Sequence, residues 1–260
     1  MEKYQKLMAA IVVIAIISVA TFVFWNQTNQ EQDSIYVYCG AGLRKPMEDI
    51  GNLFEDEYGI KVEYNYAGSE TLLSQMELNP EGDVYMPGAT LYIEKADDKG
   101  FIGNQSLVAY HTPVIAVPEG NPANITCLED LMEPGVEIVL GDGEAAACGK
   151  IANKILEKND IYDEVNANVI SRTATANELA VYIAQEQADA TICWRADLCG
   201  LENETDIIEI PEEQNIIKII PIGTLTFTEK DDFANLFIEF VSSDIGKDIF
   251  EEYDFIKYEG

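Results

Sequence analysis

The sequence alternates twice between short extended segments and segments with helical spacing, and this pattern most constrains the fold. The extended segments are rich in Val, Ile and Tyr and are predicted strands. They lie at 35–39, 62–66, 83–86, 136–140, 165–170 and 190–194. Strand–helix repetition predicts a mainly parallel sheet covered by helices. Because the pattern occurs in two sets, we expect two α/β lobes.

Residues that begin and end helices support this assignment. Pro46 falls in the first turn of the first predicted helix, and Gly59 stands at its end as a C-cap residue. The C-terminal stretch 230–253 is predicted as two helices separated near residue 243. Further extended apolar segments lie at 114–117, 207–210 and 217–222.

The predicted organisation is a periplasmic-binding-protein type II architecture with two β/α lobes and a central cleft. Residues 34–112 together with 224–260 form the first lobe, and 113–223 form the second. Two hinge crossovers join the lobes, and residues 1–33 precede them as membrane anchor and linker. Open α/β sheets bind ligands at the carboxyl ends of their strands, so we expect the ligand in the cleft.

Residues 7–25 form a run of 19 positions without a formal charge, preceded by Lys3 and Lys6. At a rise of ~1.5 Å per residue, a helix of this length spans ~28 Å, close to the apolar core of a bilayer. The positive-inside rule places the basic end in the cytoplasm. A cleaved signal peptide is the competing interpretation, but no small-residue cleavage pattern follows the run. We therefore expect a single-pass anchor in the cell membrane and an extracytoplasmic body.

The chain carries 47 acidic and 16 basic residues, a formal net charge of −31. A surface of this sign repels nucleic acid, which we exclude as a partner. Two interpretations of the charge stay open, namely adaptation for solubility or high salt and a role in collecting cations. The chain has one histidine, His111, and neither a serine-nucleophile motif nor a paired metal motif. We therefore predict that the protein is not an enzyme and has no metal site.

The five cysteines form no CxxC pair, which argues against a zinc ribbon. An extracytoplasmic location permits disulfides, whose pairing the sequence leaves open. The cysteines are Cys39, Cys127, Cys148, Cys193 and Cys199. N-x-S/T sequons are candidate glycosylation sites in such a location. The four sequons begin at Asn26, Asn104, Asn124 and Asn203.

Several stretches, taken in their order and spacing, resemble one known family. Residues 36–43 place a strand and three small residues before a helix, and residues 66–72 place a glycine and a serine before the next. Further matching stretches are 82–85, 117–131 and 187–197. From residue 35 to 255 the layout resembles type II periplasmic solute-binding proteins of the molybdate/tungstate ABC-transporter family. The resemblance implies a monomeric receptor, without a cofactor, that binds molybdate or tungstate and delivers it to an ABC-transporter permease.

The resemblance also implies which residues of the first lobe bind the ligand. Ala41 and Gly42 fall where relatives often carry a serine, so a hydroxyl is missing here. Arg44 is a candidate replacement, with a surface position in the first helical turn as the alternative. Gly68 and Ser69 match the second serine loop of the family, with a plain helix cap as the alternative for Ser69.

The second lobe is expected to contribute mainly backbone donors. Cys148 with Gly149, and Ala176 with Asn177, fall where the family offers N–H groups at helix starts. Trp194 falls at the position of a ligand-facing tyrosine. Its indole N–H could donate as the phenol does, or the ring could serve as a core or hinge residue.

Charged residues near these positions leave the ligand open. Arg44 and Arg195 could hold a larger or organic anion bidentately. Glu144 or Asp142 could instead complete a six-coordinate oxyanion, as the resemblance to archaeal tungstate binders implies. A ferric-ion receptor is another alternative, because the chain has 13 tyrosines, although most alternate along strands as core residues do. The last alternative is a membrane-tethered sensor or adhesion domain without a ligand.

Overall fold

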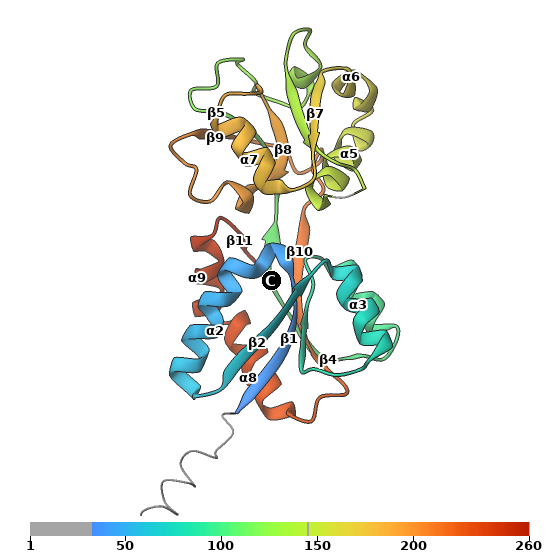
Figure 1. Cartoon of the computed structure of the whole chain (residues 1–260), viewed down its shortest axis with the longest axis vertical. Helices are drawn as coiled ribbons and strands as arrows, with labels where there is room; N and C mark the ends of the chain where they lie inside the picture. The colour runs from blue at the N-terminus through green and yellow to red at the C-terminus, as the bar shows by residue number, and fades with distance from the viewer. Residues whose placement is uncertain (1–32, 145, 260) are drawn as a thin grey trace, which may run out of the picture.

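The computed structural model describes residues 33–144 and 146–259, which form two α/β lobes stacked along the long axis of the molecule (Figure 1). The first lobe contains the first and last described parts of the chain, and the second lobe contains the middle part. The expected membrane anchor at 7–25 lies outside the described residues. Within the described part of the chain, no helix is both long and apolar enough to cross a bilayer.

The first lobe is built on one mixed sheet of six strands. They are β1 (Ser34–Gly40), β2 (Lys61–Ala67), β3 (Val84–Met86), β4 (Ile102–His111), β10 (Lys218–Leu225) and β11 (Ile256–Lys257). Their order is β11-β4-β10-β3-β1-β2. β1 pairs in parallel with β2 and with β3, so Gly40 lies opposite Ala67 and Cys39 opposite Met86. The carboxyl ends of these three strands therefore meet at one edge of the sheet.

Helices cover both faces of this sheet and enclose two separate cores. They are α2 (Arg44–Tyr58), α3 (Ser69–Leu78), α4 (Thr90–Asp97), α8 (Asp231–Ser242) and α9 (Asp244–Glu252). α2, α8 and α9 cover one face, where Phe54 packs edge-to-face on Phe237 at 5.0 Å (Figure 1). α3 and α4 cover the other face, around the buried side chains of Met76 and Tyr85.

The second lobe combines an antiparallel and a parallel group of strands. The strands are β5 (Pro113–Pro118), β6 (Ile138–Gly141), β7 (Val169–Thr173), β8 (Thr191–Trp194) and β9 (Thr205–Glu209). β5 lies between β8 and β9, β6 pairs in parallel with β7, and a parallel bridge from Ile138 to Ala190 joins the two groups. The elements that accompany them are the 3-10 helices η2 (Glu129–Met132) and η3 (Arg195–Leu198) and the helices α5 (Ala147–Lys158), α6 (Tyr162–Ala167) and α7 (Ala176–Ala184). The carboxyl ends of β6, β7 and β8 thus share one edge.

The structure confirms the alternation of strands and helices but corrects two details. The predicted strand at 165–170 is wrong over its first half, which belongs to α6. Ile161 and Val165 are four residues apart and both buried, so a helical turn directs both into the core. β10 pairs with β4 from Lys218 onward, which places the return crossover before Lys218 and not at residue 223. α4 and β4 were not predicted.

Two crossovers join the lobes, and three aromatic rings pack beside them. The first crossover runs from β4 through Thr112 into β5, and the second connects β9 to β10. His111 stacks on Trp194 with ring centroids 3.8 Å apart, and Phe255 lies 5.2 Å from His111. We call these three rings the hinge stack. Burial lowers the pKa of His111 to about 3, so its imidazole is neutral at physiological pH.

Candidate functional site

Three loops leave the carboxyl edge of the first lobe's sheet side by side. They follow β1, β2 and β3 and lead into the 3-10 helix η1 (Ala41–Leu43), into α3 and toward α4. A side chain added to Gly40 would lie 3.2 Å from the backbone nitrogen of Gly88. The starts of the first and third loops are therefore in contact, and the second loop starts from Ala67, opposite Gly40.

Ser69 is the first residue of α3 and ties two of these loops together. Its Oγ accepts a hydrogen bond from the Gly88 N–H at 3.1 Å, and its carbonyl accepts one from the Tyr85 hydroxyl at 2.8 Å. A serine hydroxyl that accepts one hydrogen bond still has its own proton to donate. The half-exposed Ser69 can thus offer a hydrogen bond to a ligand at this edge.

The predicted residues of η1 and of the first turn of α2 differ in their surroundings. Ala41 and Gly42 are exposed, and a side chain added to Gly42 would meet no atom within 4 Å. Arg44 is engaged elsewhere, because its guanidinium lies 4.0 Å from the centre of the Tyr66 ring and 3.4 Å from the Glu48 carboxylate. Arg44 therefore lies at the first turn of α2, beside the carboxyl end of β2, with its guanidinium held between a tyrosine ring and a carboxylate.

In the second lobe, α5 begins directly over the end of β6. A side chain added to Gly149 would lie 2.3 Å from the Gly141 carbonyl oxygen, a distance that no side chain can adopt. Cys148, beside it, is buried in the first turn of α5. The first N–H groups of a helix have no acceptor within the helix, so this tight contact fixes the position of several potential donors.

A reciprocal pair of hydrogen bonds begins α7. The Thr175 hydroxyl accepts from the Glu178 N–H at 3.3 Å, and the Glu178 carboxylate accepts from the Ala174 N–H at 3.0 Å. The backbone N–H groups of Ala176 and Asn177 precede the first intrahelical hydrogen bond. Both N–H groups therefore point outward along the axis of α7, at its N-terminal end, where the helix dipole is positive.

Trp194 is the last residue of β8 and Arg195 follows it at the same edge, and both are held by neighbours. Trp194 is buried in the hinge stack, with 8% of its surface exposed. The Arg195 guanidinium forms an ion pair with Glu209 of β9, and its Nε is buried without a hydrogen-bond partner among the described residues. The structure thus brings Trp194 to the hinge and attaches Arg195 to its own lobe.

Two carboxylates of the second lobe occupy very different environments. The predicted Glu144 is exposed, and its N–H donates to the Asp142 carboxylate at 2.9 Å. Asp197, which was not predicted, accepts a hydrogen bond from the Trp194 N–H at 3.3 Å. Burial raises its pKa to about 6, against the opposing charge of Lys45 on α2. The sequence pattern could not indicate Asp197, because only the fold buries this side chain near a lysine of the other lobe.

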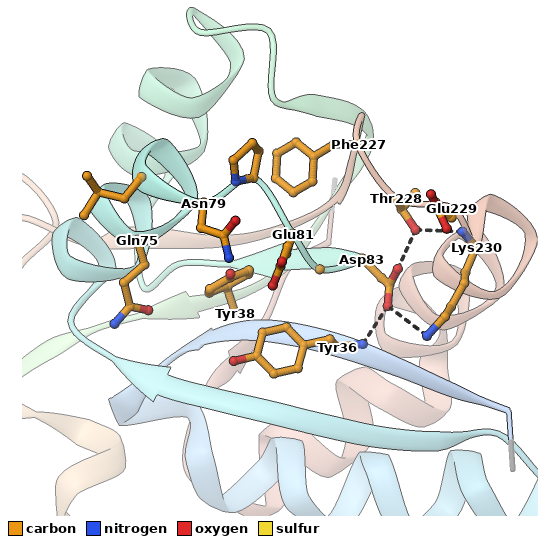
Figure 2. Close-up of a pocket in the computed structure, with 13 residues that line it drawn as sticks. Tyr36, Tyr38, Gln75, Asn79, Glu81, Asp83, Phe227, Thr228, Glu229 and Lys230 are labelled. Carbon is orange, nitrogen blue, oxygen red and sulfur yellow. Dashed lines mark hydrogen bonds and ion pairs between the residues drawn. The ribbon is translucent and has the colours of Figure 1, made fainter. Parts of the chain in front are cut away.

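A separate pocket of about 810 Å³ lies at the opposite edge of the first lobe's sheet, beside the starts of β1 and β3 (Figure 2). Asp83 lies at its floor and accepts hydrogen bonds from the Tyr36 N–H at 2.7 Å and the Thr228 hydroxyl at 2.5 Å. The Lys230 ammonium lies 3.8 Å from the same carboxylate and donates to the Ser34 carbonyl at 2.6 Å. This pocket is not at the edge where the predicted ligand residues gather.

The remaining candidates for metal binding are weak in the described part of the chain. Cys199, Glu202 and Asp254 place ligand atoms within 4.8 Å of one another. Burial first, then the neighbouring Asp254 carboxylate, raise the pKa of the Cys199 thiol, which disfavours the thiolate that a metal ion binds. All five cysteines are free thiols in the structure.

Comparison with known proteins shows the family and the fold. Residues 35–256 match the family described as bacterial extracellular solute-binding protein. The chain is 26% identical to a putative binding protein of Haemophilus influenzae, over 93% of this chain and 98% of that protein. It is 25% identical to the molybdate-binding protein ModA of Mycobacterium tuberculosis, over 86% of this chain and 85% of that protein.

Two solved structures share the fold. The substrate-binding domain of a putative molybdenum ABC transporter from Clostridium difficile superposes with a TM-score of 0.76, at 19% identity, over 87% of this chain and 99% of that one. PEB3 bound to L-phospholactate superposes with a TM-score of 0.67, at 20% identity, over 86% of this chain and 100% of that one. With the family match over most of its length, the chain belongs to the bacterial extracellular solute-binding proteins, which are non-enzymatic components of transport systems.

Proposed function

We propose that this protein is the receptor of an ABC importer and binds a tetrahedral oxyanion, molybdate or tungstate, between its lobes. The observation that carries the proposal is the position of α3, α5 and α7, which all begin at carboxyl edges of parallel strands. Both edges face the middle of the molecule, where the crossovers run (Figure 1). The molybdate-binding relatives support the choice of ligand.

Such a site holds an anion without a buried cation. Helix starts present N–H groups and the positive ends of helix dipoles, and the Ser69 hydroxyl adds a further donor. The net charge of −31 opposes an anion, but salt screens charges beyond ~8 Å. Short hydrogen bonds therefore outweigh the distant field. We further propose that residues 7–25 anchor this monomeric receptor in the cell membrane, with its body outside.

The ferric-ion alternative receives less support from the tyrosines. Burial raises the pKa values of Tyr64, Tyr66 and Tyr85 above the ordinary value, which disfavours the phenolate that iron requires. The Tyr64 hydroxyl also donates to the Met47 carbonyl at 2.5 Å. A phosphorylated organic acid is a better second candidate, because the open space at Gly42 leaves room for a larger anion and a protein of this fold is bound to L-phospholactate.

The proposal is tested by titrating the full chain in detergent with tungstate. Tens of micromolar tungstate should raise the melting temperature, because a ligand that binds only the folded state stabilises it. We expect Ser69→Ala to weaken binding by roughly 10- to 100-fold, the value of one hydrogen bond to a charged group. Ser74→Ala is the matched control, since Ser74 lies on the same helix and donates to the Glu70 carbonyl.

Three results would contradict the proposal. One is a stabilisation by Fe³⁺ with none by any oxyanion. Another is the absence of stabilisation by every anion tested, which would favour a sensor or adhesion domain. The third is equal affinity of the Ser69→Ala and Ser74→Ala variants, which would place the site elsewhere.

A further inference from the structure

The pocket of the first lobe, opposite the carboxyl edge, has aromatic walls (Figure 2). Tyr36 and Tyr38 pack edge-to-face with ring centroids 5.2 Å apart, and Phe227 lies across from them. Gly82 leaves room for these rings, because a Cβ atom added there would lie 2.7 Å from the Tyr38 ring. The volume of about 810 Å³ falls in the range of small-molecule sites.

Two polar groups in this pocket have no partner among the described residues. Tyr38 is 6% exposed, yet its hydroxyl makes no hydrogen bond with the described part of the chain, and Tyr38 lines the pocket. Glu81 also lines the pocket and forms no ion pair among the described residues. Burial first, then Tyr36 and Glu81, raise the pKa of Tyr38. Because both residues line one pocket, the carboxylate and the hydroxyl can act on one ligand. A neutral phenol and a carboxylate can both accept hydrogen bonds.

The electrostatics of the pocket favour a cation. Glu81 and Glu229 line it, while the lysine there, Lys230, is already bound to Asp83 and to the Ser34 carbonyl. α3 ends at Leu78, so the negative end of its dipole lies at the pocket wall. The net charge of −31 draws cations toward the surface as a whole.

We propose that this pocket is a second ligand site, which takes a small organic ammonium ion. The ammonium N–H groups donate to the Glu81 carboxylate and the Tyr38 hydroxyl, and the alkyl part packs on the aromatic walls. Ammonium ions are also attracted to the faces of aromatic rings. A neutral sugar would gain nothing from the second carboxylate or from the end of the α3 dipole.

One helix separates this site from the proposed oxyanion site. α3 begins with Ser69 at the carboxyl edge of the sheet and ends at Leu78 beside the pocket. Its positive end faces the first site and its negative end the second. The ammonium site does not depend on the proposed oxyanion function, and either proposal can fail alone.

Calorimetric titration of the full chain in detergent with 1,4-diaminobutane, at low and constant ionic strength, tests the site. We expect saturable binding of one diamine, weakened at least tenfold by Glu81→Gln and several-fold by Tyr38→Phe. Glu94→Gln is the matched control, because it removes one exposed carboxylate from the same lobe outside the pocket. Its diamine affinity should stay within twofold of the parent chain. Tungstate affinity should be the same in all variants.

Three outcomes would overturn the ammonium site. One is the absence of saturable diamine binding. Another is equal weakening by Glu94→Gln and Glu81→Gln, which would show diffuse attraction to the acidic surface. The third is binding of a neutral sugar such as maltose that is as tight as diamine binding and insensitive to Glu81→Gln.

Discussion

Both lobes have helices that begin at the carboxyl edge of parallel strands, but the two edges differ in how tightly they are packed. In the first lobe the edge is open, since a side chain at Gly42 would meet no atom within 4 Å and the Ser69 hydroxyl can still donate. In the second lobe the edge is closed, since Gly149 lies against the Gly141 carbonyl and a paired set of hydrogen bonds begins α7.

This difference separates two contributions to the proposed site. There the second lobe would supply backbone donors whose positions are fixed by tight packing, and few substitutions at Gly149 are compatible with the fold. The first lobe would supply a side-chain donor and free space, so residues such as Gly42 can change without disturbing the sheet. Ligand specificity within this architecture should therefore vary mainly through the first lobe.

The largest expected effect comes from filling the closed edge. Gly149→Val should lower the free energy of unfolding by more than about 3 kcal/mol, because its side chain would overlap the Gly141 carbonyl. Gly42→Val, the matched change at the open edge, should stay within about 0.5 kcal/mol of the parent chain. Urea unfolding of both variants measures the difference. Similar losses in both would remove the contrast between the lobes.

The next effect concerns the hinge stack between the lobes. The pKa of His111 is about 3 in the folded chain and higher when unfolded, so unfolding takes up a proton below about pH 6.5. His111 therefore contributes stability that is present at neutral pH and is lost as the pH falls. As the pH falls from 7 to 5, the free energy of unfolding of His111→Phe should therefore rise by about 2 kcal/mol relative to that of the parent chain.

Asp197 acts in the opposite direction and provides the control. Its folded pKa of about 6 lies above its unfolded value near 4, so it favours the folded chain below about pH 6. That contribution is lost as the pH rises through 6. Asp197→Asn should therefore lose stability relative to the parent chain as the pH falls from 7 to 4.5. A pH-independent difference for His111→Phe would show that the imidazole is solvated.

The smallest expected effect is a change in tungstate affinity when a hydroxyl is added at the open edge of the first lobe. Gly42→Ser should bind tungstate about fivefold more tightly, because a new hydroxyl can contribute ~1 kcal/mol as a donor. Its stability should not change, since the added atoms meet no neighbour within 4 Å of the first carbon. Calorimetric titration measures the affinity. Unchanged or weaker binding would show that Gly42 does not face the ligand.

Local signals in the sequence predicted most of the fold. As expected, Pro46 lies in the first turn of α2 and Gly59 ends the helix, in the left-handed conformation with φ 72°. The error at 165–170 arose because short apolar segments fit a strand and a helix equally well. β4 was missed because its burial does not alternate regularly, with three exposed residues following Ile102.

For the candidate site, the sequence predicted only those features that depend on backbone order. The loops at Ser69 and Cys148 follow from the succession of strands and helices. The partners of the arginines do not, because Arg44 stacks on a tyrosine of β2 and Arg195 pairs with Glu209 of β9. The ammonium pocket combines residues near 36, 80 and 228, which only the folded sheet brings together.

The proposed oxyanion site lies between the helix starts of both lobes. Crystals of the full chain grown with tungstate would locate tungsten directly by its anomalous scattering. We expect one strong peak within hydrogen-bonding reach of Ser69 and of the first N–H groups of α5. A peak elsewhere on the chain, or no peak at a tungstate concentration that stabilises the protein, would contradict an oxyanion site between the lobes.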